Sequence, residues 1–414
     1  MIAGLPVQGL VPRLAAELRE FDAFGTRTQV QPFEVPGAVQ VPVFVNEFWT
    51  AKQRDAHSLH EISYRACFKP QLPRFFIERL TSPGDTVYDP FMGRGTTVLE
   101  AALVNRRPLG CDANPLCAML TRPRLSPPSQ AAVAARLASI NFVFKAEIPE
   151  DLLAFYHAET LRQICALKHH LAVRQSDGDF DALDGWIQMV ALNRLTGHSP
   201  GFFSVYTLPP NQAVSLQSQR RINARRKQIP PLRDVPELIL KKTRSLLADC
   251  SESDRVRLAA LGAETRFFTK SCESVPEIAP GTVDLVVTSP PFLNVVDYAA
   301  DNWLRCWFLG FDAASVKLSI HRRPPDWRAA MTRVFTELHR VLRPGGHIAF
   351  EVGEVNAGRV LLEELVVQAG TAANFTPELI LINDQEFTKT ANCWGVANNT
   401  KGTNTNRIVV FQKP

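Results

Sequence analysis

The residues of this chain with the clearest chemical potential are Ser289, Pro290, Pro291 and Phe292, directly after the apolar run Val283 to Thr288. Two consecutive prolines fix φ and remove two N–H donors, so the carbonyls of this strand end stay out of regular ladder pairing. A hydroxyl, free carbonyls and an aromatic face remain. These groups suit a planar ring that carries an exocyclic amine: the oxygens accept from the amine and the aromatic face stacks on the ring. Such an amine is a poor nucleophile, because its lone pair is conjugated into the ring, so its methylation needs a site of this kind. By itself this motif is a weak signal, because most Pro-Pro pairs are turns.

A second motif lies much earlier in the chain. A β-rich run ends at Asp89, and Gly93 and Gly95 form a turn into the predicted helix Val98 to Asn105. Glycine allows φ > 0 and close approach of the backbone to a ligand, and a helix N-terminus offers unpaired N–H groups. A second predicted strand ends in Asp112, and an acid in this position accepts from ribose hydroxyls in nucleotide-binding sheets. The motif therefore predicts a site for a nucleoside cofactor.

A dinucleotide-binding fold is the competing interpretation. It is disfavoured because Val98 stands where G-x-G-x-x-G needs its third glycine. Asp-Pro-Phe-Met-Gly-Arg-Gly-Thr-Thr and Thr-Ser-Pro-Pro-Phe instead resemble the cofactor and catalytic motifs of S-adenosylmethionine-dependent DNA amino-methyltransferases, and among these the cytosine-N4 enzymes. Ser289 before the prolines is the usual cytosine-N4 form, whereas adenine-N6 relatives usually carry Asp or Asn. The resemblance covers residues 60–120 and 265–414.

The resemblance implies a class I (Rossmann-like) α/β methyltransferase fold, with a seven-stranded, mostly parallel sheet and a large, mainly helical insertion. It implies S-adenosylmethionine as the cofactor and the Ser-Pro-Pro-Phe residues as catalytic. After the third strand, relatives often carry an Asp near the cofactor's adenine amine; here Ser271 and Glu273 are the alternatives. The residues implied to bind the cofactor are Lys69, Pro70, Asp89, Pro90, Phe91, Gly93, Gly95, Thr96, Thr97, Asp112 and Ser271.

The composition is that of a globular protein. With 414 residues, 45% of them hydrophobic, the chain is long enough for one large α/β core and an insertion. We expect no transmembrane helix, no signal peptide and a cytoplasmic, nucleoid-associated location. The eight cysteines show no C-x-x-C spacing, so we expect reduced thiols and no metal site. The net charge of +5 is modest, and a polyanion site must come from local clustering.

The chain divides into an extension, a catalytic domain in two pieces and an insertion. Residues 1–60 form the extension, with an amphipathic helix predicted from Leu14 to Phe24. Residues 61–120 and 263–414 carry the cofactor-binding catalytic domain, and its last two strands are expected to include one antiparallel strand. Residues 121–262 are the helical insertion, since the second and third strands of such a sheet are normally only a few tens of residues apart.

The insertion holds the clearest nucleic-acid feature. Between Tyr206 and Arg244 there are nine Lys or Arg and two Asp or Glu, a local charge of +7. Amides stand beside the arginines; amides and arginines read base edges, while Lys and Arg hold phosphates. The alternative for this segment is a solvated basic helix. The polar segment 398–407 is a second candidate for contact with the DNA backbone, and its alternative is a turn-rich hairpin loop. The candidate DNA-binding residues are Arg220, Arg221, Arg225, Arg226, Lys227, Lys401 and Asn404.

Together these features predict methylation of the N4 amine of a cytosine flipped out of duplex DNA. The context is restriction–modification, with a cognate restriction endonuclease as a candidate partner, or an orphan epigenetic methylase. Asp297 and Tyr298 are second-tier candidates for the target-base pocket, although Asp297 equally fits a helix N-cap. An adenine-N6 enzyme, an RNA or protein-glutamine methyltransferase and a non-catalytic DNA-binding relative are the alternatives.

Overall fold

One nine-stranded sheet runs through the molecule in the order β1-β2-β8-β9-β7-β6-β3-β4-β5. The computed structural model describes residues 10–36, 40–50, 56–65, 67–207, 213–293, 298–316, 321–353, 360–384 and 405–414. The strands are β1 (Gln29–Phe33), β2 (Val41–Asn46), β3 (Thr86–Asp89), β4 (Arg107–Cys111), β5 (Arg266–Phe268), β6 (Val283–Thr288), β7 (Leu342–Val352), β8 (Thr376–Asp384) and β9 (Thr405–Gln412).

Seven of these strands confirm the expected class I fold. β3 pairs in parallel with β4 and β6, β4 with β5, and β6 with β7. β9 is antiparallel to both β7 and β8, so the final strand pair has the expected direction. In a doubly wound sheet of this kind, ligands bind at the carboxyl ends of the strands, where the strand order reverses. Here the order reverses between β3 and β6.

The expectation of seven strands was wrong by two, because the N-terminal extension continues the sheet. β2 pairs in parallel with β8, and β1 closes the edge. The join is fixed by Asn383, which is buried; its Oδ1 accepts from the backbone N–H groups of Phe48 at 2.7 Å and Trp49 at 3.2 Å. The extension thus covers the β8 edge, which would otherwise expose unpaired backbone groups.

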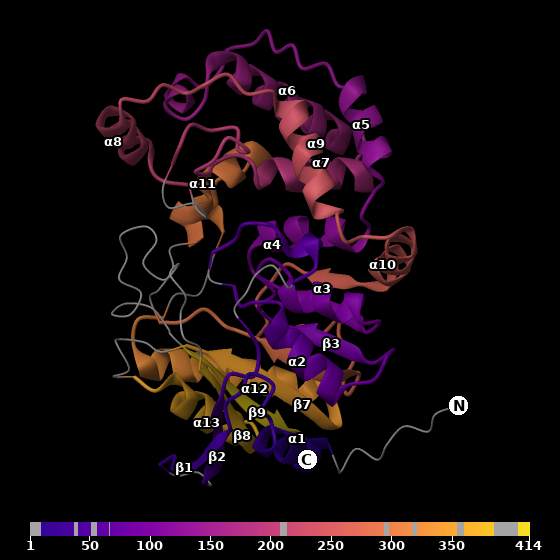
Figure 1. Cartoon of the computed structure of the whole chain (residues 1–414), viewed down its shortest axis with the longest axis vertical. Helices are drawn as coiled ribbons and strands as arrows, with labels where there is room; N and C mark the ends of the chain where they lie inside the picture. The colour runs from indigo at the N-terminus through magenta and orange to yellow at the C-terminus, as the bar shows by residue number, and fades with distance from the viewer. Residues whose placement is uncertain are drawn as a thin grey trace.

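Helices cover both faces of the sheet (Figure 1). α1 (Leu10–Arg19), α2 (Gln71–Leu80) and α3 (Thr96–Leu103) lie on one face, and α12 (Pro324–Val341) and α13 (Leu362–Ala372) on the other. α10 (Glu252–Glu264) packs beside α3 and β4. The first helix ends earlier than predicted, at Arg19, because Phe21 packs on Phe48 and its carbonyl accepts from the Asn46 side chain at 3.0 Å.

Most of the remaining helices gather at one end of the molecule, and α4 lies between them and α3 (Figure 1). The remaining helices are α4 (Pro115–Thr121), α5 (Gln130–Ser139), α6 (Ala158–Ser176), α7 (Ala182–Leu192), α8 (Leu216–Arg226), α9 (Val235–Leu246) and α11 (Tyr298–Leu309), with 3-10 turns η3 (Ser58–His60), η4 (Arg122–Leu125), η5 (Glu150–Ala154) and η6 (Ala313–Ser315).

This helical part shares one hydrophobic core with the cofactor side of the sheet. Trp186 of α7 is fully buried, and its Nε1 donates to Thr243 Oγ1 of α9 at 3.1 Å. The same core reaches Val98 and Leu99 of α3 and Met92 of the glycine loop. The helices are therefore packed onto the site end of the sheet. In the described ranges, no helix is both long and apolar enough to span a bilayer.

Candidate active site and nucleic-acid interface

The two sequence motifs meet at the adjacent ends of β3 and β6. Thr288 Oγ1 donates to Asp89 Oδ1 at 2.6 Å, and Thr97 Oγ1 of α3 donates to the Val287 carbonyl at 3.1 Å. The backbone N–H of Phe91 donates to the same Asp89 oxygen at 3.1 Å. These bonds join the glycine loop and the Ser-Pro-Pro-Phe segment, which are far apart in the sequence, at the point where the sheet order reverses.

Asp89 is a buried connector between the two strands. The residue is 1% exposed, and burial raises the pKa of its carboxyl to about 7 against the hydrogen bonds from Thr288 and the Phe91 N–H. Burial thus favours the neutral form of this carboxyl.

The loop after β3 has the features of a nucleoside-binding cradle. The backbone N–H of Gly93 donates to Asp112 Oδ2 at 3.0 Å, and that of Asn114 to Asp112 Oδ1 at 2.9 Å. Gly93 has φ +49°, and a Cβ placed there would have its nearest neighbours, in Cys67 and Tyr64, 3.8 Å away. The positive φ of Gly93 and the acid at the end of β4 are the features that nucleoside-binding loops of this kind use.

Gly95 has a different task. It is the N-cap of α3 with φ +73°, and a Cβ there would lie 2.3 Å from the side-chain Oγ1 and Cγ2 of Thr121. The protein itself therefore requires this glycine. The side chains of Thr96 and Thr97 are buried as well; Thr96 Oγ1 accepts from Arg94 Nε at 3.2 Å. These residues shape the loop.

The flanking candidates lie near the loop or beyond the next strand. Pro70 is the N-cap of α2, and the pKa of Lys69 is lowered by burial and by Arg94. Beyond β5, the Glu273 carboxylate receives two bonds of 2.9 Å from the Arg333 guanidinium. Ser271 is exposed, and its hydroxyl accepts only a long bond of 3.3 Å from the Glu273 N–H among the described contacts. Of the two alternatives for the adenine contact, Ser271 is thus the freer side chain.

Two residues that the motif did not reveal lie at this end of the sheet. Glu351, 5% exposed at the end of β7, accepts from Asn406 Nδ2 of β9 at 3.0 Å. Trp327 Nε1 of α12 donates to the Pro291 carbonyl at 2.9 Å. Phe292 packs partly buried against the core of the α12 face. An acid inside the otherwise apolar end of the β7 run is the sequence signal that points to Glu351.

Some predicted residues lie at or beyond the limits of the described structure. Tyr298 is the first residue of α11. Asp297, Lys401 and Asn404 lie outside the described residues. Within the described residues, no group of three His, Cys, Asp or Glu side chains is placed to hold a metal ion.

Helix α8 presents one cationic face. Its exposed residues recur at helical spacing, whereas the Gln219 and Asn223 amides bond to backbone carbonyls. Gln219 Nε2 donates to the Tyr206 carbonyl at 3.1 Å, and Asn223 Nδ2 to the Ala154 carbonyl at 2.7 Å. The expectation that the amides beside the arginines read base edges is therefore wrong for Gln219 and Asn223, because the buried Gln219 and the half-buried Asn223 donate to backbone carbonyls instead. The exposed positions on the face are Gln217, Arg220, Arg221, Ala224 and Arg225.

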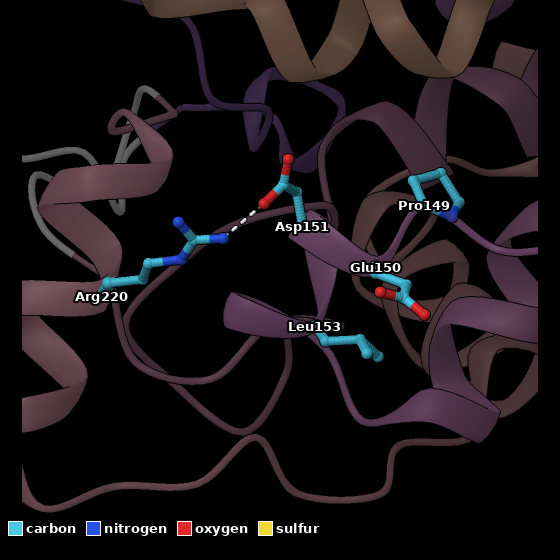
Figure 2. A pocket seen from close by; sticks show the side chains of 5 residues that line it. All are labelled: Pro149, Glu150, Asp151, Leu153 and Arg220. Atoms are coloured by element: carbon cyan, nitrogen blue, oxygen red, sulfur yellow. Dashed lines mark hydrogen bonds and ion pairs between the residues drawn. The ribbon is translucent and has the colours of Figure 1, made fainter.

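The cations of α8 fall into two groups. Arg220 forms an ion pair with Asp151 beside Pro149, Glu150 and Leu153 (Figure 2). The Arg226 guanidinium lies 3.8 Å from the centre of the Tyr206 ring. The other three are exposed and form no ion pair within the described part of the chain: Arg221, Arg225 and Lys227.

The segment before α8 is fastened to the helix that follows the catalytic segment. The Ala213 N–H donates to the Asp301 carbonyl of α11 at 3.1 Å, and Trp303 Nε1 donates to the Val214 carbonyl at 3.2 Å. α11 begins shortly after Phe292. The basic helix and the catalytic segment are thus linked through one structural element.

The chain is similar to DNA methylases. A DNA methylase family model matches residues 31–120. The type II methyltransferase M.BsoBI from Geobacillus stearothermophilus is 23% identical over 63% of this chain and 54% of its own length. M.MvaI from Kocuria varians is 22% identical over 55% and 52%. The chain thus spans about half the length of these relatives. A TehB-like S-adenosylmethionine-dependent methyltransferase structure from Corynebacterium glutamicum matches with 9% identity and a TM-score of 0.31, over 83% of this chain and 87% of its own.

The two glycines of the loop are expected to respond differently to alanine. Gly95→Ala adds positive-φ strain and a clash with Thr121, and should lower the free energy of unfolding by about 2–4 kcal/mol. Gly93→Ala has the strain without a clash and should cost about 1–2 kcal/mol. Urea unfolding of both variants tests this, and equal losses would contradict the assignment of Gly95 to packing.

The raised pKa of Asp89 predicts a specific pH dependence of stability. Because its folded pKa of about 7 lies above the ordinary 3.8, its stabilising contribution is full below the unfolded pKa and is lost as pH rises through about 7. Asp89→Asn keeps an oxygen for Thr288 but cannot titrate. From about pH 5 to about pH 9, wild type should therefore lose on the order of 2–4 kcal/mol relative to the variant. Other titrating groups, such as His60 and His347, are present in both proteins, so their contributions cancel in the difference between the two unfolding free energies. A constant difference in urea unfolding across that range would show that Asp89 does not titrate there.

Proposed function

We propose that this chain is an S-adenosylmethionine-dependent DNA methyltransferase that modifies the N4 amine of a cytosine flipped out of duplex DNA. The observation that carries the proposal is the Thr288–Asp89 hydrogen bond of 2.6 Å. It holds the glycine loop and the Ser-Pro-Pro-Phe segment at neighbouring strand ends, which supports a site where a cofactor and a base meet. The similarity to type II methyltransferases supports the same class of substrate, and Ser289 supports cytosine over adenine.

The cofactor would lie over the glycine loop. Gly93 leaves room for it, Asp112 offers carboxylate oxygens to its ribose, and Phe91 and Ser271 flank the nucleoside, while Lys69 and Pro70 stand toward its methionine end. Bound there, S-adenosylmethionine supplies an electrophilic methyl group.

The target base would lie against Ser289 and Phe292. A base inside a duplex cannot reach the site, so it must be flipped out at a cost of a few kcal/mol. Phe292 stacks on the ring, and the Ser289 oxygen and the Pro290 carbonyl accept from the amine. The bond from Trp327 to Pro291 keeps the segment rigid, so that catalysis comes from positioning and preorganised charge.

The DNA backbone would lie along the exposed face of α8. Arg221, Arg225 and Lys227 are free to meet phosphates, and the link through α11 fixes this face relative to the catalytic segment. We assign DNA recognition to the insertion, residues 121–262. Its last helix, α10, packs with the sheet and is not part of the DNA-binding face. This activity fits a restriction–modification pair with a cognate endonuclease. It also fits an orphan methylase that acts on the nucleoid.

Adenine-N6 methylation of DNA is the second candidate, because such relatives share the cofactor loop and differ mainly at the position of Ser289. Incubation with duplex DNA and labelled cofactor, digestion to nucleosides and mass identification separates the two products. Recovery of N6-methyladenine would replace the cytosine assignment, and absence of any methylated nucleoside in DNA would reject the proposed function.

Variants of the catalytic segment should lose turnover and keep the cofactor. Ser289→Ala removes a bond that strengthens in the transition state and should cost about 2–4 kcal/mol, roughly 30- to 1000-fold in single-turnover rate. Phe292→Ala should lose about 1–3 kcal/mol of base stacking. Calorimetric cofactor affinity should stay near that of wild type for both. Normal turnover with weakened cofactor binding would show that the two motifs serve the opposite ligands.

A matched pair of charge variants tests the DNA-binding face. Arg221→Ala with Arg225→Ala removes two exposed cations of α8 and should reduce the slope of log affinity against log salt by roughly one unit per lost contact. Lys241→Ala with Arg244→Ala removes two exposed cations of α9 and should leave that slope unchanged. Equal slopes for the two double variants would show that α8 is a solvated basic helix that does not contact DNA phosphates.

A further inference from the structure

We propose that the ion pair between Arg220 and Asp151 recognises one G·C base pair of the DNA target through its major-groove edge. This inference rests on the proposed function and deepens it, because it names residues that select the sequence around the methylated base. Arg220 belongs to α8 and Asp151 to the 3-10 turn η5. Their side chains point toward each other across the space between these two elements (Figure 2).

Helix α8 and η5 are held together without this ion pair. Asn223, one turn after Arg220 on α8, donates through Nδ2 to the Ala154 carbonyl of η5 at 2.7 Å, and Leu152 of η5 is buried. The side chains of Arg220 and Asp151 are 60% and 66% exposed, and an ion pair between groups this exposed contributes little to stability. The pair is therefore available to a ligand.

The pair forms part of a surface hollow. Its lining residues are Pro149, Glu150, Asp151, Leu153 and Arg220. Three of the five are charged, whereas sites for small molecules are lined mostly by apolar side chains. The hollow therefore suits a polar edge better than an enclosed apolar ligand. Arg220 also belongs to the exposed face of α8 that we assign to DNA, so a duplex bound along this face would meet the hollow.

The acidic side chains in this place favour contact with bases. Glu150 and Asp151 are exposed beside a helix whose Arg221 and Arg225 are also exposed. Phosphates repel carboxylates, so acids on a face that holds only the DNA backbone would weaken binding. The partners that DNA offers to a carboxylate are amino groups on base edges, such as the N4 amine of cytosine. The acid next to Arg220 thus indicates a contact in a groove.

The hydrogen-bonding pattern of the pair is complementary to G·C. A guanidinium only donates and a carboxylate only accepts. Within the described residues, neither Arg220 nor Asp151 has a side-chain hydrogen-bond partner besides the other, so further donors and an acceptor stay free side by side. In the major groove, guanine presents two acceptors, N7 and O6, and the paired cytosine presents the N4 donor next to them. Two donors from Arg220 and one acceptor from Asp151 match this order.

An A·T pair does not match the same groups. Its major-groove edge presents the acceptor N7, the donor N6 amine and the acceptor O4. The N6 amine would face a donor of Arg220, and O4 would face the Asp151 carboxylate. A bidentate contact of this kind discriminates against the wrong base by about 5- to 150-fold in affinity. The ion pair would therefore select G·C at the position it meets.

Selection of bound duplexes from a random-sequence pool tests the inference without requiring methylation. The full chain is incubated with the pool and S-adenosylhomocysteine, and the bound duplexes are sequenced. Wild type should require G·C at one position besides the target base, with an affinity about 5- to 150-fold above that for A·T. Arg220→Ala should bring this ratio close to one. Asp151→Asn should also lower it, because an amide N–H can donate to thymine O4. The other selected positions should stay as in wild type.

Two variants serve as controls. Arg221→Ala removes a neighbouring cation of α8 that we assign to phosphates; it should weaken binding to all duplexes about equally and keep the selected sequence. Glu252→Gln breaks the ion pair with Arg255 on α10 and should change neither affinity nor sequence. The melting temperatures of Arg220→Ala and Asp151→Asn should stay near that of wild type, because the bond from Asn223 still fastens η5 to α8.

The outcomes separate the inference from the proposed function. If wild type selects no sequence, or if Arg220→Ala and Asp151→Asn select the sequence of wild type, the inference fails, and methylated nucleosides from wild type would leave the proposed function standing. An equal loss of affinity for all sequences in both variants would make the pair a backbone or structural contact and would also overturn the inference. If wild type selects DNA but methylates none, the proposed function fails, while loss of the G·C preference in both variants still supports the reading role of the pair.

Discussion

The structure of the site depends on the pairing of β3 with β6 and on the hydrogen bond between Thr288 and Asp89 at its end. Each motif comes at the carboxyl end of its strand, and parallel strands bring such ends to one edge. The bond fixes the two ends against each other inside the core. Burial raises the pKa of Asp89 to about 7, so the stability of this join depends on pH. Every other part of the site is arranged around this join.

Buried polar groups define the surroundings of the join. Arg94 donates to the Ile62 carbonyl at 3.0 Å, and Arg124 to the Leu59 carbonyl at 3.3 Å. Both guanidiniums are buried and hold the segment before α2 over the glycine loop. On the other side, Trp327 holds the Ser-Pro-Pro-Phe segment through the Pro291 carbonyl. Groups of this kind are costly to leave unpaired, so they specify one geometry more sharply than apolar contacts do.

The helical part adds a surface that the sheet lacks. Its core is continuous with that of α3, so α8 is carried on a body that is packed against the site. The inward amides of α8 fasten it, and the exposed cations remain for a polyanion. The bonds from α11 hold the segment before α8 in place.

The sequence by itself determined the class of fold, the strand that ends at Thr288 and the two motif segments, because those depend on local signals: apolar runs, glycines and prolines. It did not determine that the extension adds β1 and β2, since the partner of β2 is β8, more than three hundred residues away. It assigned Gly93 and Gly95 the same role, and only packing against Thr121 separates them. It assigned the amides beside the arginines to base edges, and only the bonds to the Tyr206 and Ala154 carbonyls show that Gln219 and Asn223 are engaged by the protein. Glu351 has no motif of its own; its meaning arises from the neighbouring strand, because hydrogen bonds between distant residues exist only once the sheet has formed.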